Sequence, residues 1–151
     1  MTSVGFALDD IRLELPTRDA PLKWVVVVDA QLAPGAALNS AVCVAAATAA
    51  HVGGLLGPEA HDPDGGRHPG LPWAGCTLLR ASREQLAELR DKVALWEDSY
   101  VADMPLAAQE TRVYADYLAH VAAEGAPPYA ALSLVGPRNR VSKAVKRLEL
   151  A

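Results

Sequence analysis

The most hydrophobic stretch of the chain runs from Trp24 to Val28, a tryptophan followed by four valines. Lys23 and Asp29 bound it on either side. An uninterrupted apolar run of strand length between charged residues predicts a central β-strand buried on both faces, as in parallel sheets. Shorter apolar runs predict three further strands, at residues 75–79, 99–104 and 129–135.

Helical patterns occupy the intervals between these strands. Ser82 followed by Gln85 predicts a capping box at the start of one helix. The predicted helices span residues 37–52, 82–96, 105–124 and 141–148, the third with Tyr114, Tyr117, Leu118 and Val121 facing inward. Strands that alternate with helices predict an α/β protein, here a three-layer α/β/α sandwich with a small mixed sheet of four strands.

The first 20 residues differ from the predicted core of residues 21–151, although all 151 are expected to form one domain. Apolar residues between Phe6 and Leu15 predict a short edge strand or an extended arm that ends at Pro16. An arm this apolar could pack across a second chain. A homodimer is therefore a hypothesis, which a monomer mass in solution would contradict.

Composition and charge narrow the class of protein. The chain is 51% hydrophobic and carries a net charge of −4, which argues against general affinity for nucleic acid or an anionic membrane. Its basic tail, residues 138–147, is either a solvated helix face or a site for a phosphate-bearing ligand. The chain has no signal-peptide pattern and no spanning apolar run, so a cytoplasmic location is expected. Cys43 and Cys76 are expected to be buried free thiols.

Residues 53–72 form a long loop rich in Gly, Pro, Asp and His. His61 and His68 stand seven residues apart with carboxylates between them, a pattern that could hold a divalent ion. Pro63 and the neighbouring glycines instead favour a turn, and a loop of this length favours a lid over a pocket. We therefore expect neither a metal nor a cofactor. The chain also has no phosphate loop, dinucleotide motif or Gly-x-Ser-x-Gly motif.

Two polar residues beside predicted strand and helix ends are candidates for chemistry. Asp103 ends the strand at 99–104, where it could act as a general base or substrate anchor, or could cap the next helix. Asn39 begins an apolar helix, where it could cap that helix or bind a carbonyl group or an anion. Gln109 and Tyr114 are expected to line the same cleft as Asp103.

Several segments together resemble known families. The strand at 24–28, the turn at 29–35, the helix at 38–45 and the closing Gly136-Pro137 resemble type II peptidyl-tRNA hydrolases. More closely, Leu38-Asn39, His68-Pro69-Gly70, Val101-Ala102-Asp103 and the run from Gly136 to Val141 resemble a bacterial family, domain of unknown function 2000, of the same fold group. The resemblance implies a peptidyl-tRNA hydrolase II-like fold. It also adds His68, Arg138 and Asn139 as candidate substrate contacts.

The chain departs from the hydrolase pattern where that family does its chemistry. Ala36, Leu38 and Val42 stand where the hydrolases carry lysines and a glutamine, and Ala107 falls near their threonine. Only Asp103 matches their aspartate. These departures argue against authentic peptidyl-tRNA hydrolysis. Two hypotheses remain. In the first, the protein is a divergent, metal-free hydrolase or acyl-transfer enzyme for a small acyl, amide or ester substrate or an anionic metabolite. In the second, it is a non-catalytic binding or assembly module.

Overall fold

The computed structural model describes residues 3–151 and contains a mixed sheet of five strands in the order β5-β6-β1-β4-β7. The strands are β1 (Leu22–Asp29), β4 (Thr77–Ala81), β5 (Tyr100–Pro105), β6 (Tyr129–Pro137) and β7 (Glu149–Leu150). Strand β1 pairs parallel with β4 and antiparallel with β6. The mixed sheet is confirmed, but the predicted count of four strands is wrong. The fifth strand, β7, has two residues, too few to show a strand pattern in the sequence.

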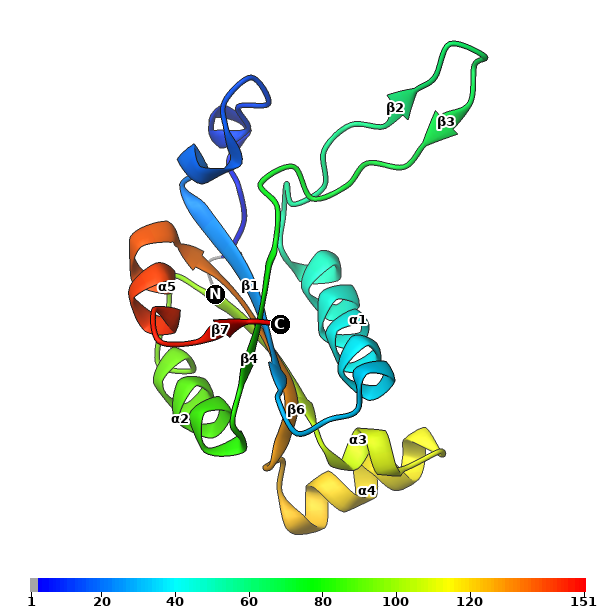
Figure 1. Ribbon diagram of the computed structural model, residues 1–151, viewed down its shortest axis with the longest axis vertical. Coiled ribbons are helices and arrows are strands. Elements are labelled where there is room, and N and C mark those ends of the chain that lie inside the picture. The colour runs from blue at the N-terminus through cyan, green and yellow to red at the C-terminus, as the bar shows by residue number, and fades with distance from the viewer. Residues whose placement is uncertain (1–2) are drawn as a thin grey trace.

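Strand β1 lies at the centre of this sheet, as its run of valines predicts. Val25 and Val27 are fully buried against α2 (Arg83–Val93) and α5 (Arg138–Val145). Val26 and Val28 face the opposite layer, which contains α1 (Pro34–His51). Successive side chains of a strand point to opposite faces, so four consecutive valines bury both faces of one strand. Helices therefore cover both faces of the sheet (Figure 1).

The helix boundaries follow local chemistry that is partly legible in the sequence. The predicted capping box of α2 is present: the Ser82 hydroxyl accepts from the Gln85 amide at 3.2 Å, and the Gln85 side chain accepts from the Ser82 amide at 2.9 Å. Helix α1 begins at Pro34, three residues before the predicted start. Proline suits the first helical position because its missing N–H has no partner there anyway.

The prediction of one continuous helix over residues 105–124 is wrong, although most of that range is helical. Pro105 is the last residue of β5, and two helices follow, α3 (Ala107–Glu110) and α4 (Tyr114–Glu124). Neither helix has a fully buried residue, and Tyr114 is 74% exposed. Helix α4 lies beside α3 at one end of the sheet and does not cover its face (Figure 1). The apolar spacing in α4 therefore does not mark a core-facing surface.

The N-terminal segment packs on its own chain, and the prediction of an edge strand there is wrong. Two short 3-10 helices, η1 (Leu8–Asp10) and η2 (Thr17–Asp19), replace the strand. Phe6 is buried, with its ring 4.8 Å from that of Trp73. The Phe6 amide donates to the carbonyl of Gly53 at 2.9 Å. The homodimer stays a prediction.

The long loop contains a two-stranded hairpin, β2 (Ala60–His61) and β3 (Arg67–His68), that projects away from the sheet (Figure 1). It lies at the end of α1 opposite to α3 and α4. Between residues 3 and 151, no helix is long and apolar enough to cross a membrane.

Candidate functional site

A cavity of about 340 Å³ opens between α1, the edge strand β5 and the α3–α4 segment. Helix α1 contributes Asn39, Cys43 and Ala47, which are four residues apart and so share one face of the helix. The complete lining is Asn39, Cys43, Val44, Ala47, Asp103, Met104, Ala108, Thr111, Arg112, Tyr114 and Tyr117. Sequence reasoning placed three of these residues, Asn39, Asp103 and Tyr114, in one cleft.

Gln109, which was predicted to line the same cleft, does not line the cavity and instead contacts Asn39, which does. The Gln109 side-chain amide donates to Asn39 Oδ1 at 3.1 Å, to Ser40 Oγ at 2.8 Å and to the carbonyl of Ala36 at 3.0 Å. The prediction that Asn39 caps α1 is wrong, because α1 begins five residues earlier and its cap residue is Ala33. Asn39 lies instead in the second turn of the helix, where Gln109 orients its side chain.

Asp103 is held by an ion pair from the other face of the sheet. Its neighbours Ala102 and Met104 pack on the α1 side, so the alternation of β5 turns the Asp103 side chain toward α2. There Arg90 Nε donates to Asp103 Oδ2 at 3.0 Å. This hydrogen bond is the largest cause of a raised pKa at Arg90. The prediction that Asp103 caps the following helix is wrong, since the cap residue of α3 is Leu106.

Two tyrosines and an arginine form the outer wall of the cavity. The rings of Tyr114 and Tyr117 lie 5.4 Å apart. Desolvation raises the pKa of Tyr117, and the nearby Tyr114 and Asp103 raise it further. The Tyr117 phenol therefore keeps its proton at neutral pH and can donate it in a hydrogen bond. Arg112 is exposed and makes no ion pair within the described part of the chain.

The remaining predicted contacts lie elsewhere. His68 is in the hairpin, with Nε2 3.3 Å from Asp62 Oδ2. The Arg138 guanidinium donates to the backbone carbonyls of Thr17 in the N-terminal segment at 2.8 Å and of Leu22 in β1 at 3.1 Å. Asn139 is exposed on α5. None of these three residues lines the cavity, so their role as substrate contacts stays a prediction.

The hairpin holds its own carboxylate by local hydrogen bonds. Asp62 accepts from the amides of Gly66 at 2.8 Å and Asp64 at 3.0 Å. The bond from Gly66, followed by that from His68, lowers the pKa of Asp62. Among residues 3–151, no three His, Cys, Asp or Glu side chains gather closely enough to hold a metal ion. Asp62 thus acts as the organising residue of a turn.

Sequence reasoning missed the contribution of Cys43, Thr111 and Arg112 to the cavity. Cys43 could have been found, since it stands one helical turn after Asn39. Thr111 and Arg112 lie between α3 and α4, inside the region predicted as one continuous helix. The prediction that both cysteines are buried is also wrong, because Cys43 and Cys76 are free but exposed.

Cys76 is expected to be a slow nucleophile. The residue is exposed as a whole, yet desolvation of its thiol raises the pKa to about 11. At pH 8 roughly one thiol in a thousand is then ionised, against about a quarter for an ordinary cysteine. In a Cys43→Ser variant, the rate of alkylation by iodoacetamide should rise about tenfold per pH unit between pH 8 and 10. The same variant unfolded in urea is the control and should react about 250-fold faster at pH 8, the ratio of the two ionised fractions. Equal rates for folded and unfolded protein would contradict the shift.

The architecture is shared with a solved structure, that of protein Atu0240, a protein of unknown function from Agrobacterium tumefaciens strain C58. The two structures superpose with a TM-score of 0.78 at 17% sequence identity, covering 87% of this chain and 98% of that chain. At this identity the likeness concerns the fold alone.

The family model described as protein of unknown function (DUF2000) matches residues 22–151 of this chain. The chain therefore belongs to this family, as its motifs suggested. No curated protein matches the chain. The kinship with type II peptidyl-tRNA hydrolases stays a prediction.

Proposed function

We propose that the cavity between α1, β5 and α3–α4 binds a small organic molecule with a short apolar acyl part and an amide, ester or carboxylate group. The observation that carries this proposal is the lining itself. Apolar side chains such as Val44, Met104 and Ala108 form its walls, and a few polar groups stand around them. A concave, largely apolar space with a few oriented polar groups is the usual form of a small-molecule site.

Each polar group at the cavity suits a different part of such a ligand. The Asn39 amide, oriented by Gln109, can bond a carbonyl or an amide group. The Tyr117 phenol keeps its proton and can donate it to a ligand oxygen. Asp103 borders the cavity, but its carboxylate is turned toward α2 and held by Arg90 there. Arg112 can pair with a carboxylate through two parallel hydrogen bonds. This set favours an N-acyl amino acid or a related amide over a purely apolar ligand.

Binding without catalysis is the better supported reading of the site. Asp103 is the carboxylate that a hydrolase would use, but it is turned toward α2 and engaged in an ion pair with Arg90. Cys43 is the candidate nucleophile, and no histidine lines the cavity beside it. Nucleophilic catalysis needs such a base within hydrogen-bond reach. We keep a hydrolase-like activity of peptidyl-tRNA hydrolase II type as the second candidate.

An assembly role has one observation in its favour. Large apolar side chains are exposed on the helices that line the cavity: Leu38 (61%) and Val42 (66%) on α1, and Leu118 (54%) on α4. Leu38 and Val42 are the positions aligned with the hydrolase lysine and glutamine. Leu38 and Val42 are one helical turn apart and so adjacent on α1, and neighbouring exposed apolar residues are typical of interaction surfaces. A second copy of the chain covering them would give the predicted homodimer.

The test is a titration of ¹⁵N-labelled protein with N-butanoylglycine, followed by NMR. We expect shifts in residues 39–47 and 103–117. Cys43→Trp fills the cavity from an exposed position and should weaken binding about tenfold or more. Ala46→Trp is the matched control, because Ala46 is exposed on α1 and does not line the cavity. Arg112→Ala should weaken binding of N-butanoylglycine, whose carboxylate Arg112 would pair with, and leave binding of the methyl ester of N-butanoylglycine unchanged.

Four outcomes would favour an alternative to this proposal. Shifts confined to other regions would place the ligand elsewhere. Equal affinities of the Cys43→Trp and Ala46→Trp variants would show that the cavity is not used. A dimer mass that only Cys43→Trp converts to a monomer would favour the assembly reading. Release of glycine from the probe, measured by chromatography, would favour the hydrolase reading.

A further inference from the structure

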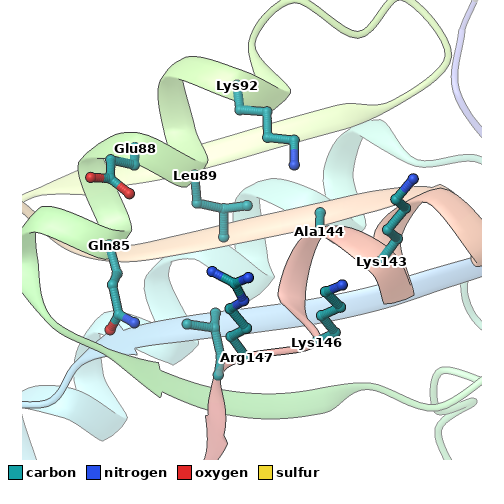
Figure 2. A pocket seen from close by; sticks show the side chains of 9 residues that line it. Gln85, Glu88, Leu89, Lys92, Lys143, Ala144, Lys146 and Arg147 are labelled. Carbon is teal, nitrogen blue, oxygen red and sulfur yellow. The ribbon is translucent and has the colours of Figure 1, made fainter.

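A second concave site lies on the opposite face of the sheet, between α2 and α5. It encloses about 330 Å³. Its lining comes from both helices and from the turn before β7: Gln85, Glu88, Leu89, Lys92, Lys143, Ala144, Lys146, Arg147 and Leu148. Figure 2 shows Lys92 extending from α2 toward α5, and Arg147 extending from the end of α5 toward α2. We call this space the basic groove.

The basic groove concentrates positive charge in an acidic protein. Lys92, Lys143, Lys146 and Arg147 line it against the single carboxylate of Glu88, four cations to one anion, an excess of three. The whole chain carries −4. This local excess is therefore opposite in sign to the protein as a whole. Like charges held close together repel one another unless a counter-ion is bound.

None of the four cations has an ion-pair partner within residues 3–151. Other exposed arginines do find partners: Arg80 pairs with Glu149 at 2.8 Å, and Arg140 pairs with Asp98 at 2.8 Å. Each of these two arginines thus has a carboxylate partner, which the cations of the basic groove lack. In the basic groove they are left free to bind an anion.

The floor of the basic groove is apolar and fixed. Leu89 is buried in the core that α2 and α5 share, and Ala144 and Leu148 pack against the same core. At one end, Gln85 Oε1 is tied to the Ser82 amide by the capping box. The Gln85 side-chain NH₂ group is therefore an oriented donor. The groove offers cations on two facing walls, a neutral donor at one end and an apolar surface between them.

We propose that the basic groove binds a small organic molecule with two or more linked phosphate groups. Cations on both walls match phosphates that are bound from two sides, and the apolar floor matches the organic part. A single-stranded nucleic acid is disfavoured, because such sites stack bases on exposed aromatic rings. Among the residues that the structure describes, no aromatic residue lines the groove, and the ring of Trp96, which packs against the same core, is covered by the Arg140 guanidinium at 4.1 Å. The net charge of −4 also opposes a long polyanion.

The test is calorimetric titration with adenosine diphosphate and, separately, with inorganic pyrophosphate at low ionic strength. We expect adenosine diphosphate to bind at least as tightly as pyrophosphate, because the apolar floor contributes. Both affinities should fall as salt is raised. Lys92→Glu on one wall and Arg147→Glu on the other should each weaken binding about tenfold or more.

Two further variants separate the groove from general electrostatics. Arg18→Glu makes the same change in net charge at an exposed position outside the groove, and should change the affinity less than about threefold. Glu88→Gln removes the one repelling carboxylate and should tighten binding. A gain in affinity cannot result from a damaged fold.

Four results would overturn the proposal. The first two are no binding of either probe, and binding of pyrophosphate without adenosine diphosphate. The third is an equal loss of affinity in Arg18→Glu and in the groove variants. The fourth is much tighter binding of a ten-nucleotide DNA strand than of adenosine diphosphate. Binding of both probes with the expected pattern of variants would support it. The outcome is independent of the cavity beside α1, which lies on the other face of the sheet.

Discussion

Asp29→Ala is expected to lower the free energy of unfolding by about 3 kcal/mol, because it breaks an ion pair of which one partner is fully buried. Asp29 stands at the end of β1, and its side chain has no exposed surface. Its Oδ2 accepts from Arg83 Nε at 2.8 Å, and its Oδ1 accepts from the Gln31 amide at 2.9 Å. The alanine variant leaves a cavity, removes the acceptor of the Gln31 N–H and leaves Arg83 without its counter-charge. Urea denaturation followed by circular dichroism measures the change.

The chain offers a matched control for this prediction. Arg80 and Glu149 form an ion pair with the same 2.8 Å separation, but on the surface. Exposed pairs contribute little, so Glu149→Ala should leave the denaturation midpoint almost unchanged. Asp29→Asn keeps an acceptor for the Gln31 amide. Its loss of unfolding free energy should lie between those of Asp29→Ala and Glu149→Ala. Equal effects of Asp29→Ala and Glu149→Ala would contradict the argument from burial.

Ser133→Ala is expected to lower the free energy of unfolding by about 2 kcal/mol, because it leaves the buried Trp24 indole N–H without an acceptor. Trp24 Nε1 donates to Ser133 Oγ at 2.8 Å, and the Ser133 and Thr48 hydroxyls lie 2.6 Å apart. Thr48 gives its proton to the carbonyl of Val44 at 2.7 Å, so Ser133 must donate to Thr48. The result is a directed relay from β1 through β6 into α1. Thermal or urea unfolding measures the loss.

A double-mutant cycle tests the relay. Trp24→Phe removes the indole N–H. In that variant, Ser133→Ala should therefore lower the free energy of unfolding by clearly less than it does in the unmodified protein. Ser133 is fully buried in the middle of β6. Ala130, fully buried in the same strand, has no polar side-chain atom, and Ala130→Gly is a control that removes packing without breaking a side-chain hydrogen bond. Additive effects of the Trp24 and Ser133 changes would contradict the relay.

Both predictions concern the way α1 is held on the sheet. Asp29 fixes the turn that leads into α1, and Thr48 binds the last third of the helix to β6. Asn39 and Cys43 lie between these two anchors and line the cavity. Polar interactions specify one register for the helix, whereas apolar contacts alone tolerate sliding. The anchors therefore position the α1 wall of the proposed binding site.

Part of the candidate site could be predicted from the sequence. Asn39, Asp103 and Tyr114 do line one cavity, because helix starts and strand ends of an α/β sheet meet near its edge. The predicted roles of Asn39 and Asp103 as helix caps were wrong for a local reason. Helix α1 begins at Pro34 and α3 follows Leu106, so neither polar residue falls at a cap position. Shifts of a few residues in a helix boundary decide such roles.

The partners of these residues could not be predicted. Arg90 reaches Asp103 only because α2 crosses the sheet beside β5. Likewise the basic groove brings Lys92 of α2 beside Lys143 of α5 and the turn that follows α5, about 50 residues further along the chain. The sequence showed only the basic tail. The relay from Trp24 to Thr48 depends on the pairing of β1 with β6. Each of these contacts needs a register between distant segments, on which a local pattern carries no information.

The sequence by itself determined the elements that local physics governs. Four valines between charges make a strand buried on both faces, Ser82 and Gln85 start α2, and alternating strands and helices make a layered α/β protein. The tertiary structure decided the rest: the fifth strand, the packing of the N-terminal segment, the face to which Asp103 turns, and the two concave sites on opposite sides of the sheet. The physical reason is the distance along the chain over which each interaction acts. Periodicity and capping act over a few residues, whereas a binding site is made where segments distant in the chain pack together.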